Sequence, residues 1–229
     1  MALYALLDFD TLKKYDISIE EFIKTAKGLK AKILQYRDKN SSFEEKLKRI
    51  KKIRKLWKKT LIINDEIDLL PFADGIHIGQ EDLVYLCEEF QINKIEMIEL
   101  LKNSEKLKIK SEKLNINLFN LDLVNTTSKK IVGLSTHNKE EIIEANKLPL
   151  DYIGLGAYRP TTTKDTNNIL GKKVIDLIKY SYHPVAIIGG VKIYDKIPAN
   201  FKVVGSDICK LMSSRLRKKE IFKKKLKSL

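Results

Sequence analysis

The sequence has little of several residue types whose abundance would indicate a specialised class of protein. It contains two cysteines, five prolines and ten glycines in 229 residues. The cysteines, Cys87 and Cys209, form neither a metal-ligand nor a redox spacing, which predicts two reduced packing residues rather than a disulfide framework. No stretch rich in proline, glycine or serine divides the chain, and no internal repeat is visible. We therefore expect a single domain over residues 1–229.

The chain also lacks long hydrophobic runs. None approaches the roughly 18 residues that span a bilayer. The N-terminal segment has no basic start before an apolar stretch and turns acidic at Asp8, unlike a signal peptide. Hydrophobic residues make up 43% of the chain and charged residues 32%, which is typical of a soluble globular protein. We expect a cytoplasmic protein without a membrane partner.

The net charge of +14 admits more than one interpretation. Clustered Lys and Arg attract nucleic-acid phosphates. The two densest basic stretches, Lys46–Lys59 and the tail around Arg215–Lys227, have a helical pattern instead, and neither interleaves aromatics in the way a base-stacking surface would. Solvated helix faces are therefore favoured over a nucleic-acid partner, and basic charge that draws in phosphorylated substrates fits as well. Whether the chain forms a homo-oligomer, and whether the tail at 215–229 has a partner, stays open.

Short β-branched runs alternate with longer amphipathic stretches rich in Lys and Glu. This alternation is typical of a parallel sheet with crossover helices, and eight such units in about 250 residues favour closure into a (β/α)₈ barrel. The predicted strands are Tyr4–Leu7, Ala31–Tyr36, Thr60–Ile63, Gly75–Ile78, Ile131–Leu134, Tyr152–Leu155, Val185–Ile188 and Lys202–Val204.

The segment 83–130 interrupts this rhythm. Asp82 and Gly133 are separated by 50 residues, whereas one crossover helix with short loops needs about 15–20. Helical spacing of Ile92, Ile95 and Ile98 predicts one or two extra helices on the outside or the rim of the barrel. Ordinary elaboration is favoured over a lid or a dimer contact.

Polar residues follow directly after seven of the predicted strands, where barrel enzymes carry their active sites. These segments are Gln35–Lys39, Asn64–Asp65, Gly79–Asp82, Ser135–His137, Pro160–Lys164, Gly189–Gly190 and Gly205–Ser206. Any one of them could be an ordinary loop, but together they predict a polar site at one end of the barrel.

The residue types at this end suggest two phosphate sites. Arg37, Lys39 and Lys164 are three cations from separate loops, suited to an anion with several charges. Asp65 and Asp82 could act as general acid and base or could hold a hard cation, and beside three cations the metal interpretation is better, because Mg²⁺ takes one or two carboxylates together with substrate phosphate oxygens. The glycine pairs after the last two strands could bind a monophosphate through backbone N–H groups.

The same segments, in order, resemble the successive motifs of the thiamine phosphate synthase family. The resemblance rests on QYRDK at 35–39, IND at 63–65, ADGIHIGQED at 73–82, GLSTH at 133–137, DYIGLG at 151–156 with PTTTK at 160–164, and IGGV at 188–191. It covers most of the chain except 83–130 and the basic tail. As a set these motifs are highly specific.

The resemblance implies a transferase of thiamine biosynthesis that moves an alkyl or aryl group. The substrates would be 4-amino-5-hydroxymethyl-2-methylpyrimidine diphosphate and 4-methyl-5-(2-phosphoethyl)thiazole, and the products thiamine phosphate and pyrophosphate. In the family, ionisation to a pyrimidine carbocation comes first, so catalysis depends on stabilising the departing charge.

The resemblance also implies roles for individual residues. Arg37, Lys39, Asn64 and Lys164 would hold the diphosphate with Gln35 nearby, Asp65 and Asp82 would bind Mg²⁺, and Ser135 would contact the pyrimidine. Thr161, Thr163, Gly190 and Ser206 would surround the thiazole phosphate. Arg37, Lys39, Lys164 and Ser135 are the expected catalytic residues.

Two alternatives remain at this point. A thiazole tautomerase-type isomerase would share the barrel and His137 but would not need the metal and diphosphate residues, and a non-catalytic regulator would bind thiamine precursors without turnover. His77 alternates with Ile76 and Ile78, which favours a structural, hydrogen-bonded histidine. Arg159 stands where the family more often has other residues, and it could contact phosphate or face solvent.

Overall fold

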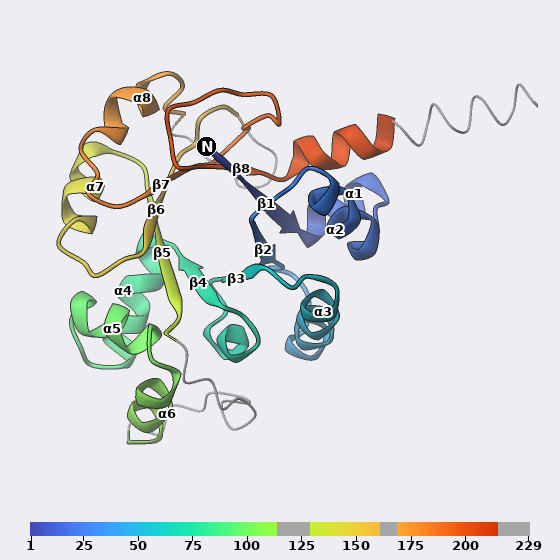
Figure 1. Ribbon diagram of the computed structural model, residues 1–229. Helices are drawn as coiled ribbons and strands as arrows, with labels where there is room; N and C mark the ends of the chain where they lie inside the picture. Colours follow the sequence, from blue (N-terminus) through green and yellow to red (C-terminus); the bar gives the residue numbers. More distant parts are fainter. Residues whose placement is uncertain (114–128, 161–168, 215–229) are drawn as a thin grey trace, which may run out of the picture.

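Eight parallel strands close into one barrel in sequence order, with helices around the outside (Figure 1). The computed structural model describes residues 1–113, 129–160 and 169–214. The strands are β1 (Ala2–Asp8), β2 (Ile33–Arg37), β3 (Thr60–Asn64), β4 (Gly75–Ile78), β5 (Ile131–Thr136), β6 (Tyr152–Leu155), β7 (Val185–Ile187) and β8 (Phe201–Val204). The predicted (β/α)₈ barrel is confirmed. The prediction of one domain over 1–229 stays a prediction.

Several of the helices begin at a residue whose side chain caps them. The helices are α1 (Phe9–Tyr15), α2 (Ile19–Gly28), α3 (Phe43–Leu56), α4 (Gln80–Glu89), α5 (Lys94–Leu101), α6 (Ser104–Lys113), α7 (Lys139–Ala145) and α8 (Lys173–Ile178), and residues 206–214 are helical as well. Ser18 and Ser42 each form a reciprocal capping box with the glutamate three residues later, which satisfies backbone N–H groups that a helix start leaves unpaired.

Two connections depart from the strand–helix alternation. The link from β3 to β4 contains a 3₁₀ helix, η1 (Ile67–Phe72), with Pro71 inside it, because ten residues that include a proline cannot form a regular crossover helix. Residues 188–200, all of which the structure describes, contain turns and bends but no helix between β7 and β8.

The long segment after β4 is helical, as predicted, in α4, α5 and α6. The carbonyl of Lys102, which caps α5, accepts a hydrogen bond from the backbone N–H of Lys130 at 3.0 Å. Lys130 directly precedes β5, so α5 has already returned the chain to the amino-terminal end of the barrel. Lys102 and Lys130, which flank the inserted segment that begins with α6, therefore both lie at the end of the barrel opposite the predicted site. Residues 114–128 lie outside the described residues.

Apolar packing occurs in two places. A large cluster fills the space between the strands and the helices, with Trp57 and Phe22 among its largest buried side chains. A smaller cluster lies inside the barrel and includes Leu6, Ile62 and Val203. Because side chains alternate across each strand, the inward positions continue upward from this small cluster to the carboxyl ends of the strands.

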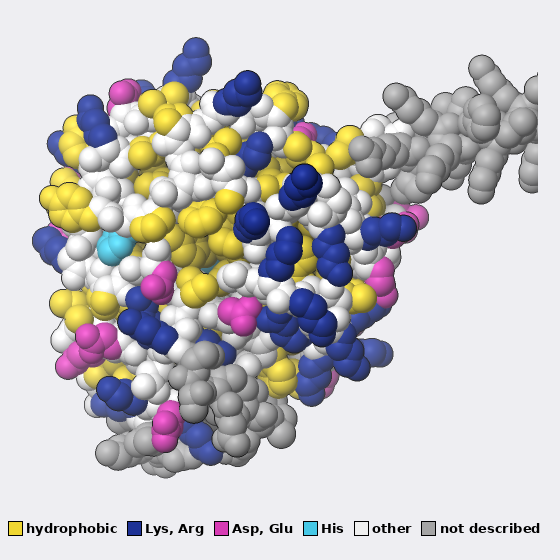
Figure 2. Space-filling model, viewed as in Figure 1, with side chains coloured by type: hydrophobic (Ala, Val, Ile, Leu, Met, Phe, Trp, Pro, Cys, Tyr) yellow, Lys and Arg dark blue, Asp and Glu magenta, His cyan; other side chains and the backbone are white. Residues whose placement is uncertain are grey.

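The surface carries mixed charge. Figure 2 shows Lys and Arg side chains most densely on the side of α2 and α3, interspersed with acidic and hydrophobic side chains. Lys52 of α3, for example, pairs with Glu20 of α2. Within the described residues, no helix is both long and apolar enough to cross a membrane.

Candidate active site at the carboxyl end of the barrel

A pocket opens at the carboxyl ends of the strands. Its walls come from the residues at or just after seven of the eight strands, β2 to β8. They include Arg37, Lys39, Asn64, Asp65, His77, Gly79, Asp82, Ser135, His137, Gly156, Ile188, Gly189, Gly190, Gly205 and Ser206. Six of the seven polar segments predicted from the sequence thus converge at one end of the barrel. Most of the seventh, Pro160–Lys164, lies outside the described residues.

Asp65 and Asp82 lie close together in this pocket. Asp65 follows β3 with a φ of +61°, a left-handed conformation that aspartate tolerates better than most residues. Asp82 lies in the first turn of α4, where its carboxylate accepts a hydrogen bond from the N–H of Gly79 at 3.1 Å. Burial and the charge of Asp82 raise the pKa of Asp65, and the charges of Lys39 and Arg37 act in the opposite direction. A bound cation would relieve the repulsion that two neighbouring carboxylates create.

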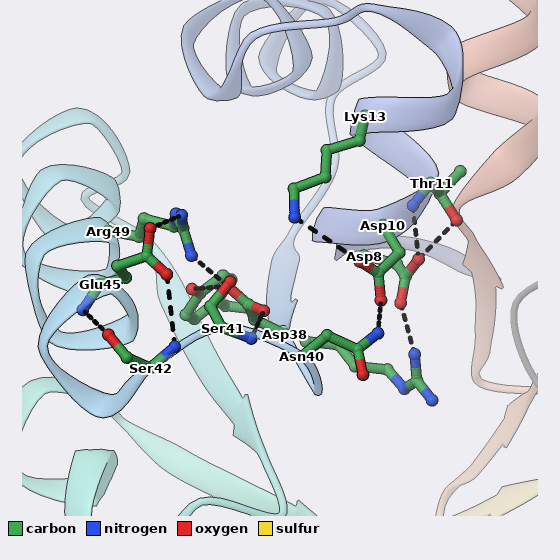
Figure 3. A network of polar contacts seen from close by, with 12 residues as sticks. Asp8, Asp10, Thr11, Lys13, Asp38, Asn40, Ser41, Ser42, Glu45 and Arg49 are labelled. Atoms are coloured by element: carbon green, nitrogen blue, oxygen red, sulfur yellow. Dashed lines mark hydrogen bonds and ion pairs between the residues drawn. The ribbon is translucent and has the colours of Figure 1, made fainter.

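Two cations face this acid pair. The Lys39 ammonium lies 3.4 Å from Asp65, and its side chain is 52% exposed, so it can reach a ligand in the pocket mouth. Arg37 ends β2, and its Nη1 donates to Asp8 at 2.5 Å. Asp8, at the end of β1, is 3% exposed and also caps α1 by accepting bonds from the N–H and hydroxyl of Thr11, as Figure 3 shows. Asp8 therefore fixes one side of the Arg37 guanidinium.

The opposite wall of the pocket is built from backbone. Gly189 and Gly190 have φ values of +86° and +61°, which only glycine adopts without strain. A Cβ on Gly190 would lie 2.7 Å from the Cβ of Arg159. Ser206 opens the helix at 206–214, and the start of a helix favours an anion because its N–H groups and dipole point toward it.

Arg159 braces this wall. Its guanidinium pairs with both carboxylate oxygens of Asp195 at 2.5 and 3.0 Å and donates to the carbonyl of Gly190 at 3.2 Å. The side chain is 38% exposed. The structure gives Arg159 a role that the sequence did not suggest, because its Nη1 and Nη2 donors hold the glycine turn. The phosphate contact considered from the sequence stays a prediction.

Beneath the pocket, polar side chains are hydrogen-bonded across the barrel. Gln35 is buried and donates through Nε2 to Asn64 Oδ1 at 2.6 Å. His77 is 6% exposed and lies between the hydroxyls of Tyr152 and Ser135, 3.0 Å from each. His137 is held at the rim by Glu141, with Nδ1 and Oε2 2.9 Å apart.

The pocket brings together most of the site residues predicted from the sequence. Eight of them line it: Arg37, Lys39, Asn64, Asp65, Asp82, Ser135, Gly190 and Ser206. Gln35 lies directly below, bonded to Asn64. Thr161, Thr163 and Lys164 lie outside the described residues, so their roles stay predictions. Among the described residues no cluster of three or more metal-ligating side chains forms, and the acid pair is the candidate for a cation.

Sequence reasoning missed four residues that shape the pocket. His77 is hydrogen-bonded, as predicted. Its ring also lines the floor of the pocket and is therefore part of the site. Tyr4 and Tyr152 looked like ordinary strand residues. Asp8 could have been found, since it is the register partner of Arg37 in the β1–β2 pair.

Comparison with known proteins identifies similar sequences and folds. A family model described as thiamine monophosphate synthase matches residues 9–93 and 119–199. The thiamine-phosphate synthase of Persephonella marina is 32% identical over 83% of this chain and 77% of its own length, and that of Clostridium acetobutylicum is 34% identical over 82% and 75%. A solved structure of thiamine phosphate pyrophosphorylase from Pyrococcus furiosus matches with a TM-score of 0.61 and 23% identity, covering 95% of this chain and 94% of the other. The solved structure supports the barrel fold.

Proposed function

The chain belongs to the thiamine monophosphate synthase family, and from this premise we propose that it joins a pyrimidine diphosphate to a thiazole phosphate to give thiamine phosphate and pyrophosphate. It is a transferase of thiamine biosynthesis. The observation that carries the proposal for this site is the pairing of two close carboxylates with two cations at the carboxyl end of the barrel.

The donor set of the acid pair suits a hard divalent cation. Asp65 and Asp82 offer carboxylate oxygens, which Mg²⁺ prefers, and Mg²⁺ commonly takes only one or two protein carboxylates when a substrate phosphate supplies further oxygens. When bound, the metal would neutralise charge that develops on the departing diphosphate. We propose Asp65 and Asp82 as the residues that would hold it.

The cations beside the acid pair would bind the diphosphate. Lys39 extends into the mouth of the pocket, and the guanidinium edge of Arg37 that Asp8 does not occupy can donate to phosphate oxygens. Asn64 lies next to them in the pocket wall. Lys164, predicted from the sequence, would add a third cation from the loop after β6.

The glycine wall would bind the second substrate. Its phosphate group fits the N–H donors around Gly190 and the helix start at Ser206, where the helix dipole favours negative charge. Thr161 and Thr163 are proposed to complete this site. The two phosphate positions then lie on opposite walls of one pocket, so the thiazole ring between them can face the pyrimidine methylene.

The reaction breaks one bond and forms one. The C–O bond between the methylene carbon and the diphosphate breaks, its electron pair leaves with pyrophosphate, and the thiazole nitrogen forms the new C–N bond. Arg37 and Lys39 favour the first event because they bind the leaving charge more strongly as it grows. Ser135 is proposed to orient the pyrimidine from β5.

The alternative isomerase is distinguishable in one experiment. A tautomerase would act on a thiazole carboxylate phosphate, would depend on His137 and would tolerate loss of Asp65. Incubating the protein with both proposed substrates and separating the products by chromatography should give equal amounts of thiamine phosphate and pyrophosphate. Conversion of the thiazole carboxylate phosphate alone, with no coupling of the two substrates, would overturn the proposed function.

A further inference from the structure

A continuous line of hydrogen bonds crosses the barrel interior beneath the pocket. It joins inward-facing residues at six different strands. The line begins at Asp65 of the acid pair and finishes at Ser135 in the pocket wall at β5. Its members, in order, are Asp65, Asn64, Gln35, Tyr4, Tyr152, His77 and Ser135.

The direction of each bond follows from the carboxylate end. A carboxylate only accepts hydrogen bonds, so the group that Asn64 turns to Asp65 is its amide NH₂. The Asn64 carbonyl then faces Gln35, which must donate through Nε2, at 2.6 Å. The Gln35 carbonyl is left facing the hydroxyl of Tyr4 at 2.9 Å, and that hydroxyl must be the donor.

The same reasoning continues to the other wall. Since the Tyr4 proton is committed to Gln35, the Tyr4 oxygen accepts from the Tyr152 hydroxyl at 2.9 Å. The Tyr152 oxygen in turn accepts from His77 Nδ1 at 3.0 Å. A neutral imidazole with its proton on Nδ1 has an acceptor at Nε2, and this nitrogen lies 3.0 Å from the Ser135 hydroxyl. Ser135 therefore donates inward, and its oxygen lone pairs face the pocket.

The aromatic members are held by close packing, so they cannot easily rearrange. A Cβ on Gly133 would lie 2.2 Å from the Tyr152 ring, and one on Gly154 would lie 2.8 Å from the His77 ring. Both rings thus use space that only glycine leaves open, and they stack with centroids 5.4 Å apart. Burial raises the pKa of Tyr4 and of Tyr152 well above the usual value, so each keeps its one proton.

We propose that Tyr4 and Tyr152 are positioning residues that fix His77 as the Nδ1–H tautomer, so that Ser135 presents a hydrogen-bond acceptor to the substrate. The proposal rests on the proposed function for the identity of that substrate. The exocyclic amine of the aminopyrimidine is the one neutral N–H donor on either substrate, and it is the group that an acceptor at Ser135 would select.

The tautomer can be measured directly in the free protein, independently of turnover. The chain has three histidines, so long-range ¹H–¹⁵N correlation spectra can be assigned by single His137→Gln and His183→Gln replacements. The wild-type protein should carry the His77 proton on Nδ1. A wild-type His77 with its proton on Nε2, or with protons on both nitrogens, would overturn the proposal.

Tyr4→Phe gives the sharper test. Without the Tyr4 oxygen, the acceptor left to the Tyr152 proton among the described contacts is His77 Nδ1, so the His77 proton should move to Nε2. A purely structural role for Tyr4 would leave the tautomer unchanged, and that result would overturn the proposal. Tyr36→Phe is the matched control, because this buried tyrosine also loses a hydrogen bond, to Asp38, outside the line; it should keep the proton on Nδ1.

Steady-state kinetics tests whether the orientation reaches the substrate. In Tyr4→Phe, the Ser135 hydroxyl should accept a hydrogen bond from His77 Nε2–H. Its own proton would then face the pocket, where it would repel the N–H groups of the substrate amine. The KM of the aminopyrimidine diphosphate should rise about tenfold, while that of an analogue with hydrogen in place of the amine should not. Equal changes for both compounds would refute the contact with Ser135. Failure to couple the two substrates would refute the proposed function. The His77 tautomer would still show whether Tyr4 and Tyr152 set the direction of the hydrogen bonds.

If Tyr4→Phe does not fold, Tyr152→Phe replaces it. This variant keeps the stacked ring and removes the oxygen that accepts from His77 Nδ1. The fraction of His77 that carries its proton on Nδ1 should then fall, and the Nε2–H form should become populated. A His77 that stays fully in the Nδ1–H form would show that the line of hydrogen bonds does not set its tautomer.

Discussion

Replacing Asp8 with asparagine should weaken catalysis through Arg37, although Asp8 itself does not line the pocket. One Asp8 oxygen accepts from Arg37 at 2.5 Å, and the other accepts from the N–H of Thr11 at 2.8 Å and from its hydroxyl. Asparagine has a single acceptor oxygen and can serve only one of these two sides. If that oxygen caps α1, the new NH₂ group faces the N–H groups of Arg37.

The magnitude follows from the bond that is lost. A hydrogen bond between charged groups contributes about 1.5–3 kcal/mol, and each 1.4 kcal/mol corresponds to roughly a factor of ten. If Arg37 binds the diphosphate only in the orientation that Asp8 holds, Asp8→Asn should lower kcat/KM for the pyrimidine diphosphate by roughly tenfold to a hundredfold. If the oxygen turns to Arg37 instead, the helix cap is lost, at a cost of about 1 kcal/mol in the free energy of unfolding.

Initial rates and urea denaturation together separate the two outcomes. Asp10→Asn is the matched control, because Asp10 lies on the same turn, is exposed, and contacts Asn40 at 2.7 Å rather than Arg37 (Figure 3). Its replacement should change kcat/KM by less than about twofold. An Asp8→Asn protein that is less stable but keeps its kcat/KM within the range of the control would refute the positioning role and leave Asp8 as a helix cap.

Three further predictions concern other parts of the molecule. Gly190→Ala should raise the KM of the thiazole phosphate and lower the free energy of unfolding by more than about 1 kcal/mol. The reason is that Gly190 has a φ of +61° and the new Cβ would lie 2.7 Å from the Cβ of Arg159. A variant with unchanged KM and stability would contradict this. Hydrogen bonding to Arg159 lowers the pKa of Asp195, so this pair stabilises the fold above the unfolded-state pKa of about 3.9 and loses its contribution as pH falls through the lower folded-state pKa. Urea unfolding from neutral to acid pH should show a smaller loss of stability in Arg159→Ala than in the wild type, and equal losses would refute the pairing. Burial raises the pKa of Cys209 to about 12, so a thiol reagent at pH 8 should label the less buried Cys87 first, and rapid labelling of Cys209 in the folded protein would contradict the packing.

The eight strands were predictable because parallel barrel strands are short β-branched runs buried on both faces. Every predicted strand is present, and no strand begins or ends more than two residues from its predicted bounds. The two-residue difference at the start of β2 has a local cause: Lys30 has a φ of +60°, and the N–H of Ala31 bonds to the carbonyl of Ala26 at the end of α2. Ala31 thus completes the end of a helix rather than beginning a strand.

The candidate site was predictable in part for a similar reason. Residues that follow successive parallel strands meet at one end of the barrel, so Arg37, Asp65 and Asp82 could be placed together from their order in the chain. The hydrogen bonds beneath them could not. Tyr4 and Tyr152 are 148 positions apart, and no local pattern indicates that their hydroxyls meet. Only closure of the barrel brings them into contact.

Magnesium dependence of coupling tests the central claim most directly, which is that Asp65 and Asp82 hold a metal beside the diphosphate. Protein stripped with EDTA should form no thiamine phosphate from the two substrates, and titration with Mg²⁺ should restore turnover along a saturable curve. Asp65→Asn and Asp82→Asn proteins, folded by circular dichroism, should not recover at the Mg²⁺ concentration that saturates the wild type, whereas Asp10→Asn should. Full turnover in excess EDTA, or normal Mg²⁺ activation of both acid-pair variants, would contradict the account.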